Sequence, residues 1–261
     1  MLRFDANITM LYRERALVDR FAAAKRDGFS AVEILSPEDA SIDELSAAAT
    51  DAGVDVVLCN APMGDFLEGG PGLSAVPGRE SDFRDAMEQA RQMAVSLGCP
   101  TVHIGPARLP PGVDRGACLD ILTANLALAA GILDGDGIVA TIEPMNTFDF
   151  PDVCLNRVSE ALAILDAAGR PNTALQFDIY HMARMEPEWL SIIEGQIDRI
   201  GHFQFADVPG RHEPGSGELD FDRAFELINR LDYAGSLGAE YVPASATSDS
   251  LAWFDKYRGI A

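Results

Sequence analysis

Four polar residues interrupt apolar runs in the second half of the chain. Glu143, Asp178 and Glu240 each stand at or next to the end of such a run, and Gln204 lies between two phenylalanines. Apolar runs of this kind are typical of parallel strands that are buried on both faces. A single acid at the end of a strand more often faces solvent or caps a helix. Four polar residues on four successive strands are hard to explain in that way, so we interpret them as a candidate site.

Three carboxylates and one amide oxygen could together bind a divalent cation. Carboxylates that lie close together repel one another unless they are protonated or neutralised, and a bound cation is a common solution. Ligation by oxygen alone favours a hard or borderline ion such as Mg²⁺ or Mn²⁺ over zinc. Such an ion polarises a carbonyl group and lowers the pKa of the adjacent C–H. The pattern therefore predicts metal-assisted chemistry at a carbonyl group.

Short β-branched or aromatic runs alternate with longer helical patterns from end to end, which is typical of repeated βα units. The predicted strands cover residues 3–8, 31–35, 55–60, 101–105, 138–143, 174–178, 200–205 and 236–241. The predicted helices cover residues 13–27, 41–52, 80–97, 114–133, 159–168, 187–196 and 221–231. Eight units without a linker indicate an α/β fold with one (β/α)₈ TIM barrel domain over residues 1–261. A doubly wound open sheet is the alternative, although no strand is followed by a glycine-rich phosphate-binding motif.

A barrel would bring the four polar residues together. Active sites of TIM barrels form at the carboxyl ends of the strands, and neighbouring strands lie about 4.8 Å apart. We therefore expect Glu143, Asp178, Gln204 and Glu240 to converge on one point of that rim.

Further candidates lie close to these positions. His181 and His202 are equally consistent with a hydrogen bond in the core and with a contact to substrate. Residues 207–218 combine several charged residues with glycines after a predicted strand, which favours a functional loop over a plain surface turn. Arg211 and His212 belong to this loop. Two weaker candidates for an anion-binding role, for which a solvated position is the better interpretation, are Arg79 and Arg108.

Composition limits the partners. The chain carries 20 Lys and Arg residues against 41 Asp and Glu residues, which gives a net charge of −21. This charge repels phosphate backbones and anionic membrane surfaces, so we expect no nucleic acid and no membrane as partners. No apolar run is seen that reaches the length of a membrane helix, and the amino end has no signal-peptide pattern. Four scattered cysteines without a CxxC spacing favour reduced, mostly buried thiols and a cytoplasmic location.

Several segments carry a family resemblance. They are IEPMN at 142–146, QFDIYHM at 176–182, HFQFAD at 202–207 and EPGSGE at 213–218. Together they resemble the hydroxypyruvate isomerase family of the xylose-isomerase-like TIM barrels, and the similarity extends over nearly the whole chain. Two segments depart from the family pattern, at 59–65 and 103–108, and both are expected to border the pocket.

The resemblance implies specific roles. A divalent metal ion would be held by Glu143, Asp178, Gln204 and Glu240, and the two glutamates would also form the acid and base pair. Many related sugar epimerases carry histidine where this chain has Gln204. The family reaction interconverts hydroxypyruvate and 2-hydroxy-3-oxopropanoate, within glyoxylate and carbohydrate metabolism, and close relatives isomerise 2-oxo-tetronates.

The expected mechanism is an aldose–ketose isomerisation through a cis-enediolate. The substrate would be a small 2-oxo acid or sugar acid, and its carboxylate would be held by His181, Arg211 or His212. A ketose epimerase with the same metal site is one alternative, and a metal-binding or sugar-acid-binding protein without catalytic activity is another. Endonucleases of the same superfamily bind several zinc ions and a polyanion, which the negative charge and the few histidines disfavour. The sequence leaves a homo-oligomeric state open.

Overall fold

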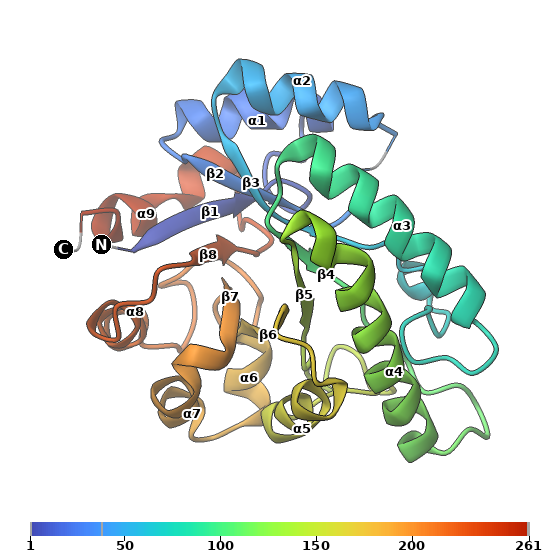
Figure 1. Cartoon of the computed structure of the whole chain (residues 1–261). Coiled ribbons are helices and arrows are strands. Elements are labelled where there is room, and N and C mark those ends of the chain that lie inside the picture. Colours follow the sequence, from blue (N-terminus) through green and yellow to red (C-terminus); the bar gives the residue numbers. More distant parts are fainter. Residues whose placement is uncertain (1, 38, 260–261) are drawn as a thin grey trace.

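Eight parallel strands close into a barrel in the order of the sequence, with β8 paired to β1 (Figure 1). The computed structural model describes residues 2–37 and 39–259. The strands are β1 Arg3–Asn7, β2 Ala31–Ile34, β3 Asp55–Asn60, β4 Thr101–His103, β5 Val139–Ile142, β6 Thr173–Asp178, β7 Ile200–Phe205 and β8 Ser236–Ala239. The predicted TIM barrel is confirmed, and the open-sheet alternative is wrong.

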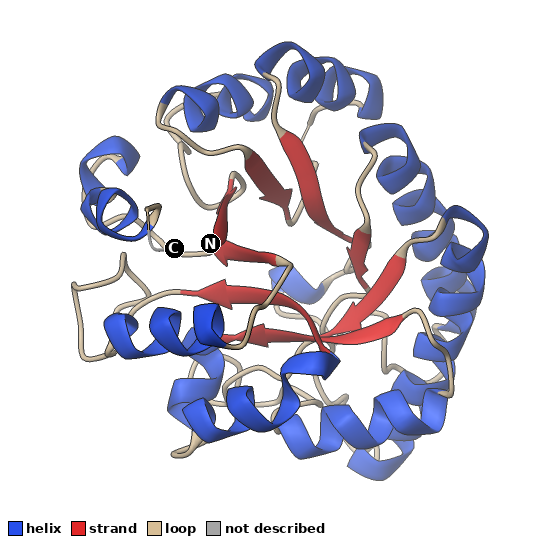
Figure 2. Ribbon diagram, turned by 60° about the vertical axis from the view of Figure 1, so that its left-hand side comes forward, coloured by secondary structure: helices blue, strands red, loops and turns tan. Residues whose placement is uncertain are grey.

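Helices form the outer layer around the strands (Figure 2). They are α1 Leu17–Arg26, α2 Ile42–Ala52, α3 Glu80–Leu97, α4 Arg115–Leu133, α5 Val158–Ala168, α6 Ile179–Met185, α7 Trp189–Gln196, α8 Phe221–Arg230 and α9 Ala252–Tyr257. Four short 3₁₀ turns are η1 Phe66–Glu68, η2 Asp134–Asp136, η3 Ile197–Arg199 and η4 Thr247–Ser250. Two of the α-helices, α6 and α9, were not predicted from the sequence.

The helix α6 begins directly at the end of β6. The side chain of Asp178 accepts a hydrogen bond from the backbone N–H of Tyr180 at 2.8 Å, which caps the first turn. An acid in this position satisfies a backbone donor that has no partner within the helix. Asp178 therefore ends a strand and begins a helix at the same point, which fixes its carboxylate at the rim.

The helix α9 seals the outer face of the barrel where β1, β7 and β8 meet. The indole of Trp253 packs edge-on against Phe4 of β1 and Phe205 of β7, with ring centroids 5.4 and 5.0 Å apart. Phe225 of α8 joins this cluster at 5.1 Å from Phe4. Aromatic pairs in such edge-to-face contacts stabilise beyond the area that they bury. The cluster thus holds together the strands that carry Gln204 and, just after β8, Glu240.

The longest apolar helix belongs to the outer layer as well. Within the 22-residue segment Arg115–Asp136, the mean hydropathy of an 18-residue window reaches 1.7, so by length and composition the segment could cross a membrane. The expectation that no apolar run reaches this length is therefore wrong. In the fold, α4 lies between α3 and α5 and packs on β5 (Figure 1), and we interpret it as a core helix of the barrel.

Cysteine usage agrees with the expectation of free thiols. All four cysteines are unpaired and buried: Cys59, Cys99, Cys118 and Cys154.

Candidate active site

A cavity of about 410 Å³ opens at the carboxyl ends of the strands. Its polar lining includes His103, Glu143, His181, Arg211 and Glu240. Its apolar lining includes Met63, Phe66 and Phe150. A larger hollow of about 710 Å³ lies at the other end of the barrel, beside residues that begin β4, β5, β6 and β7. The carboxyl-end cavity is where TIM barrels hold their active sites.

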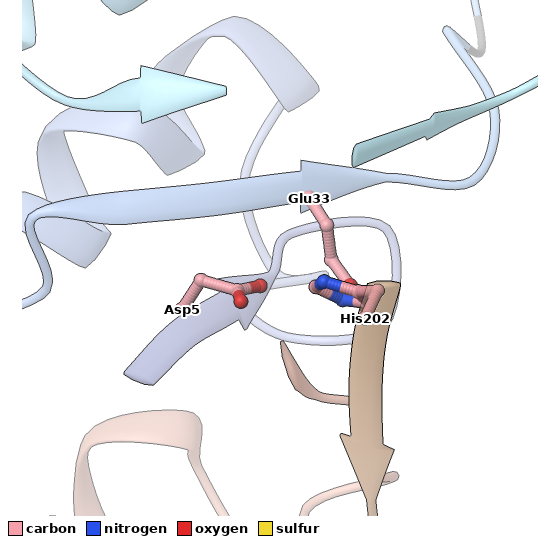
Figure 3. A group of neighbouring side chains, drawn as sticks. All are labelled: Asp5, Glu33 and His202. Atoms are coloured by element: carbon pink, nitrogen blue, oxygen red, sulfur yellow. The ribbon is translucent and has the colours of Figure 1, made fainter. Parts of the chain in front are cut away.

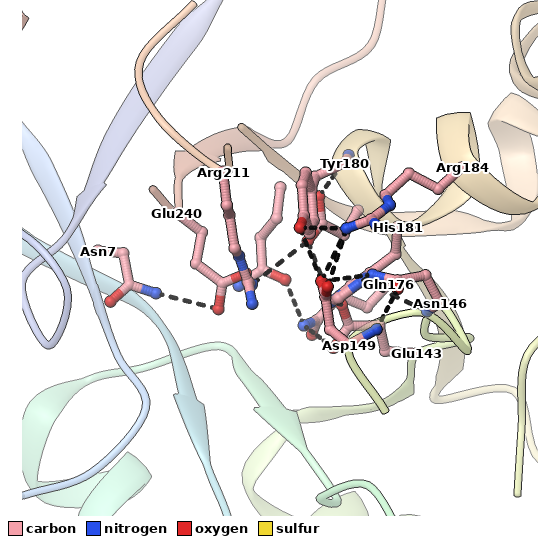
Figure 4. Close-up of polar contacts among 12 residues, drawn as sticks. Asn7, Glu143, Asn146, Asp149, Gln176, Tyr180, His181, Arg184, Arg211 and Glu240 are labelled. Carbon is pink, nitrogen blue, oxygen red and sulfur yellow. Dashed lines mark hydrogen bonds and ion pairs between the residues drawn. The ribbon is translucent and has the colours of Figure 1, made fainter. Parts of the chain in front are cut away.

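Three of the predicted acids meet around one arginine, and Figure 4 labels two of them, Glu143 and Glu240, together with Arg211. The Arg211 guanidinium lies 2.5 Å from Glu240 Oε2 and 3.7 Å from Asp178 Oδ2. Glu143 comes from the end of β5 on the other side of the cluster. Within the described residues, Glu143 Oε1 and Asp178 Oδ2 are buried without a hydrogen-bond partner. The convergence predicted from the strand ends is therefore seen for these three carboxylates.

The three carboxyl groups hold their protons unusually strongly. Burial is the largest cause in each case. It raises the pKa of Asp178 to about 6 and of Glu240 to about 8, although Arg211 opposes both shifts. The pKa of Glu143 is raised well above its usual range by burial and by the neighbouring charges of Glu240 and Asp178. Near neutral pH this cluster is thus poised between protonated and charged forms.

The cluster fits a divalent cation. Glu143 and Asp178 each offer a carboxylate oxygen, and these two oxygens lie within 4.8 Å of each other and of a ring nitrogen of His181. Buried carboxylate oxygens normally have a partner, so the two unpartnered oxygens of Glu143 and Asp178 are the strongest sign of an ion. A cation would also relieve the mutual repulsion that raises the pKa of Glu143.

His181 is neutral, and its proton is on Nε2. Burial is the largest cause that lowers the pKa of His181 well below its usual value, and Arg211 adds to the shift. The backbone N–H and the side-chain Nδ2 of Asn146 face His181 Nδ1 at 3.3 and 2.6 Å, so Nδ1 is the acceptor. The Nε2–H then points to Asp178 Oδ2 at 3.5 Å and Glu143 Oε1 at 3.8 Å. His181 is positioned as a hydrogen-bond donor within the cavity.

Gln204 lies beside the cluster and is fully buried. It pairs with Asp178 in the register of β6 and β7. Its Oε1 accepts a hydrogen bond from Gln176 Nε2 at 2.6 Å, and the same Nε2 lies 3.3 Å from Glu143 Oε2. Gln204 is therefore connected to the carboxylates through Gln176 and does not itself line the cavity.

His212 is turned away from the cavity. Its Nδ1 lies 2.7 Å from the carbonyl oxygen of Val242, and it is not among the cavity-lining residues. The structure thus brings Arg211 and His181 to the site and leaves His212 outside it. Adjacent loop residues differ in this way because the main chain at Arg211 adopts a positive φ of 56°.

Asp207 organises the loop that carries Arg211. Its Oδ2 accepts backbone hydrogen bonds from Gly215 and Gly217 at 2.8 and 2.9 Å, and its Oδ1 accepts those of Val208 and Leu219 at 2.9 and 3.0 Å. A buried carboxylate with four backbone donors leaves no place for an N–H group. The functional loop is therefore a folded structure built around one acid.

We expect Asp207→Asn to destabilise the protein by about 3 kcal/mol, because an amide NH₂ would face two backbone donors. Urea denaturation monitored by circular dichroism measures this difference. The matched control is Glu213→Gln in the same loop, since Glu213 accepts one backbone N–H, that of Ala244, at the surface. Equal stability of the two variants would contradict the organising role of Asp207.

The raised pKa values predict how the metal-free protein responds to pH. Ordinary unfolded carboxyl groups titrate near pH 4, whereas Asp178 and Glu240 titrate near 6 and 8 when folded. Between these values the folded state binds more protons than the unfolded state, so stability falls as pH rises through this window.

We expect Glu240→Gln to remove part of this dependence. Between pH 5 and pH 8 the melting temperature of the variant should therefore fall less than that of the wild type. Added Mn²⁺ should raise the melting temperature of the wild type more at pH 8 than at pH 5, because the ion competes with protons. Differential scanning fluorimetry after treatment with a chelator measures both effects. If the melting temperatures of the wild type and the variant change with pH in parallel across this window, the raised pKa of Glu240 is contradicted.

Arg108 holds one wall of the cavity. Its Nη1 donates to the carbonyl oxygens of Phe66 and Gly70 at 2.5 and 2.9 Å, and its guanidinium lies 4.0 Å from the centroid of the Phe66 ring. The expectation of a solvated Arg108 is therefore wrong, because the long loop after β3 needs a donor for its carbonyl groups. Arg79 pairs with Asp82 at the surface, as expected.

Sequence reasoning missed other polar residues near the site. His103, at the end of β4, lines the cavity, and burial lowers its pKa to about 3. Glu33 of β2 is fully buried beside Asp5 and His202 inside the barrel (Figure 3). Its signal was present, since Glu33 interrupts an apolar run in the same manner as Glu143. The two divergent segments at 59–65 and 103–108 do border the cavity, as predicted.

A closed barrel of eight parallel strands with an acidic cavity at its carboxyl rim defines a class of TIM barrel enzymes. The profile of the Xylose isomerase-like TIM barrel family matches residues 21–257. The chain belongs to this family. The predicted resemblance is thereby confirmed at the level of the family.

Full-length relatives carry isomerase names. The chain is 41% identical to a 2-oxo-tetronate isomerase of Cupriavidus necator over 259 residues, covering 99% of this chain and 100% of the relative. It is 39% identical to the hydroxypyruvate isomerase of Escherichia coli over 258 residues, with the same coverage. These relatives indicate an isomerase, as the resemblance implied.

Solved structures agree with the fold. A crystal structure of an AP endonuclease, family 2, from Brucella melitensis superposes with a TM-score of 0.94 at 36% identity and covers 98% of this chain and 99% of that one. A D-psicose 3-epimerase superposes with a TM-score of 0.75 at 16% identity, covering 96% and 89% of the two chains. The second likeness concerns the fold alone.

Proposed function

We propose that the protein interconverts hydroxypyruvate and 2-hydroxy-3-oxopropanoate, or the corresponding forms of a 2-oxo-tetronate. The observation that carries the proposal is the pair Glu143 and Glu240. They come from the ends of β5 and β8, three strands apart in the barrel, and both face the same cavity. Burial raises the pKa of Glu240 to about 8 and the pKa of Glu143 well above its usual range, so each can hold a proton in the folded protein.

The reaction moves one proton between neighbouring carbons. In the direction from hydroxypyruvate, one glutamate removes a proton from C3, the other delivers a proton to C2, and the hydroxyl proton passes from O3 to O2. Positioned acid and base groups accelerate such transfers by about 10²–10⁴-fold. A Mg²⁺ or Mn²⁺ ion held by Glu143, Asp178, Gln204 and Glu240 would polarise the carbonyl and lower the pKa of the C–H.

Two residues are proposed to orient the substrate. The Nε2–H of His181 points into the cavity and can donate to a substrate oxygen. Arg211 carries a fixed positive charge at the cavity, beside the carboxylate cluster, and can bind the substrate carboxylate through its planar guanidinium. The Tyr180 ring beneath Arg211, 5.1 Å from the guanidinium carbon, supports its orientation.

A panel of three- and four-carbon 2-oxo acids and ketoses tests the function. Each compound is incubated in deuterated water with Mg²⁺ or Mn²⁺ and followed by NMR. The proposal expects deuterium at the carbon next to the carbonyl and the appearance of the isomer from a 2-oxo acid. Turnover of ketoses with inversion at a single carbon would replace the proposal by an epimerase. Tight binding without any exchange would indicate a binding protein instead.

The net charge and the free cysteines support proposals about the binding partners of the protein and its cellular location. A net charge of −21 opposes a DNA substrate, so we propose a small-molecule partner and neither nucleic acid nor membrane. Buried free thiols are consistent with the proposed cytoplasmic location.

A further inference from the structure

Glu33 stands at the centre of a buried hydrogen-bond network inside the barrel. Its Oε1 accepts from Asn7 Nδ2 at 2.7 Å and from Gln204 Nε2 at 2.8 Å. Its Oε2 lies 2.7 Å from His202 Nε2. The strand β8, on the other side of β1, leaves room for it at Gly238, where a Cβ atom would lie 2.5 Å from Glu33 Oε2. The interior of the barrel is thus shaped around this carboxylate.

The network continues to both glutamates of the proposed reaction. On one side, Gln204 connects through Gln176 to Glu143, with contacts of 2.6 and 3.3 Å. On the other side, Asn7 Nδ2 lies 3.5 Å from Glu240 Oε1 (Figure 4). Glu33 therefore lies at the middle of an unbroken chain of contacts that joins the two proton-transfer groups.

Glu33 Oε1 accepts from two amide nitrogens, and these contacts fix which way each amide lies. Because Glu33 accepts from the NH₂ group of Gln204, the oxygen of Gln204 must point away from Glu33, toward Gln176 and Glu143. The amide of Asn7 is fixed in the same way. Its Oδ1 accepts the backbone N–H groups of Thr9 and Met10 at 3.2 and 3.1 Å.

We propose that Glu33 is a positioning residue that sets the orientation of the Gln204 and Asn7 amides next to the acid and base groups. The inference rests on the proposed function for its catalytic consequence, but the orientation of the amides does not. Glu33 does not line the cavity, so it acts through its neighbours. In proteins that bind metals, such outer contacts orient the ligands, and their loss lowers metal affinity or activity by about 10–100-fold.

The test compares Glu33→Gln with Asp5→Asn. Asp5 is an equally buried acid beside His202, and no hydrogen bond joins it to either amide, which makes it a matched control for replacing a buried carboxyl group by an amide (Figure 3). For Glu33→Gln we expect Mn²⁺ affinity, measured by calorimetry, to fall by about 10–100-fold. We expect kcat to fall over the same range with little change in KM. Asp5→Asn should keep Mn²⁺ affinity and kcat close to those of the wild type.

Side-chain amide resonances give a readout that requires neither metal nor substrate. In ¹⁵N spectra of the metal-free protein, the Gln204 NH₂ group should be shifted and protected from exchange in the wild type and in Asp5→Asn. Both signatures should be lost in Glu33→Gln. If Glu33→Gln does not fold, Glu33→Asp serves instead, because it retains an acceptor and should retain the protected amide.

The outcomes separate the two proposals. Wild-type Mn²⁺ affinity and Gln204 resonances in Glu33→Gln would overturn the positioning role, as would equal losses in Glu33→Gln and Asp5→Asn. A wild-type protein without isomerase activity would overturn the proposed function alone. The amide resonances would then still decide the role of Glu33.

Discussion

Glu240→Gln is expected to abolish deuterium exchange at the carbon next to the substrate carbonyl and to lower kcat by about 10²–10⁴-fold. Glutamine has the shape of glutamate but cannot take up the proton. The fold should remain intact, because the buried group loses a charge that burial already disfavours. NMR in deuterated water measures the exchange, and circular dichroism checks the fold.

The matched control is Glu213→Gln, because Glu213 belongs to the loop beside the site and its side chain accepts the backbone N–H of Ala244. This variant should exchange deuterium at the wild-type rate. If Glu240→Gln also exchanges at that rate, Glu240 is not the base. Loss of exchange in both variants would point to a change in the loop instead of lost proton transfer.

Arg211→Met should lower kcat/KM for a 2-oxo acid about 100-fold or more, because the variant lacks the positive charge that we propose to bind the substrate carboxylate. The neighbouring acids would also lose their counter-charge. Arg211 favours the charged forms of Asp178 and Glu240, so the pH at which activity appears should shift upward. Steady-state kinetics between pH 6 and pH 9 measure both effects.

Arg184→Met provides the control for a lost arginine. Arg184 also lies over the Tyr180 ring, with its guanidinium carbon 5.2 Å from the centroid, but it pairs with Asp149 outside the cavity. Its loss should leave kcat/KM and the pH profile close to those of the wild type. Arg211→Lys should be intermediate, since it retains the charge without the planar fork. Wild-type kinetics in Arg211→Met would remove Arg211 from substrate binding.

The barrel fold and the acids at its rim could be predicted from the sequence alone. Periodicity and strand spacing predicted the eight strands because a strand that is buried on both faces must be apolar. The same rule made Glu143, Asp178 and Glu240 conspicuous. Their convergence then follows from the geometry of any closed parallel barrel.

Other features depend on contacts between distant segments, which local patterns do not contain. Arg108 was expected in solvent, but it donates to the loop at Phe66, about forty residues earlier. The helix α9 is short and takes its place through aromatic packing on β1 and β7. His212 and Arg211 are adjacent, and only the main-chain turn at Arg211 separates their directions.

Glu33 represents a different kind of omission. It carries the same signal as the rim acids, an acid within an apolar strand, but it lies among the first strands, outside the group that drew attention. Its role becomes apparent only from its contacts in the structure, which are with Asn7, Gln204 and His202.

The position of Arg211 has a consequence for how the site is loaded. The three carboxylates are anchored at the ends of strands, whereas their arginine comes from a loop after β7. The Arg211 guanidinium therefore supplies a positive charge to these carboxylates from a loop outside the strands that carry them. If a divalent cation bound among these acids, it would neutralise them in place of Arg211, and the Arg211 guanidinium could then bind the carboxylate of a substrate. The positions of the acids and of Arg211 would then favour ordered binding, with the cation first and the organic acid second.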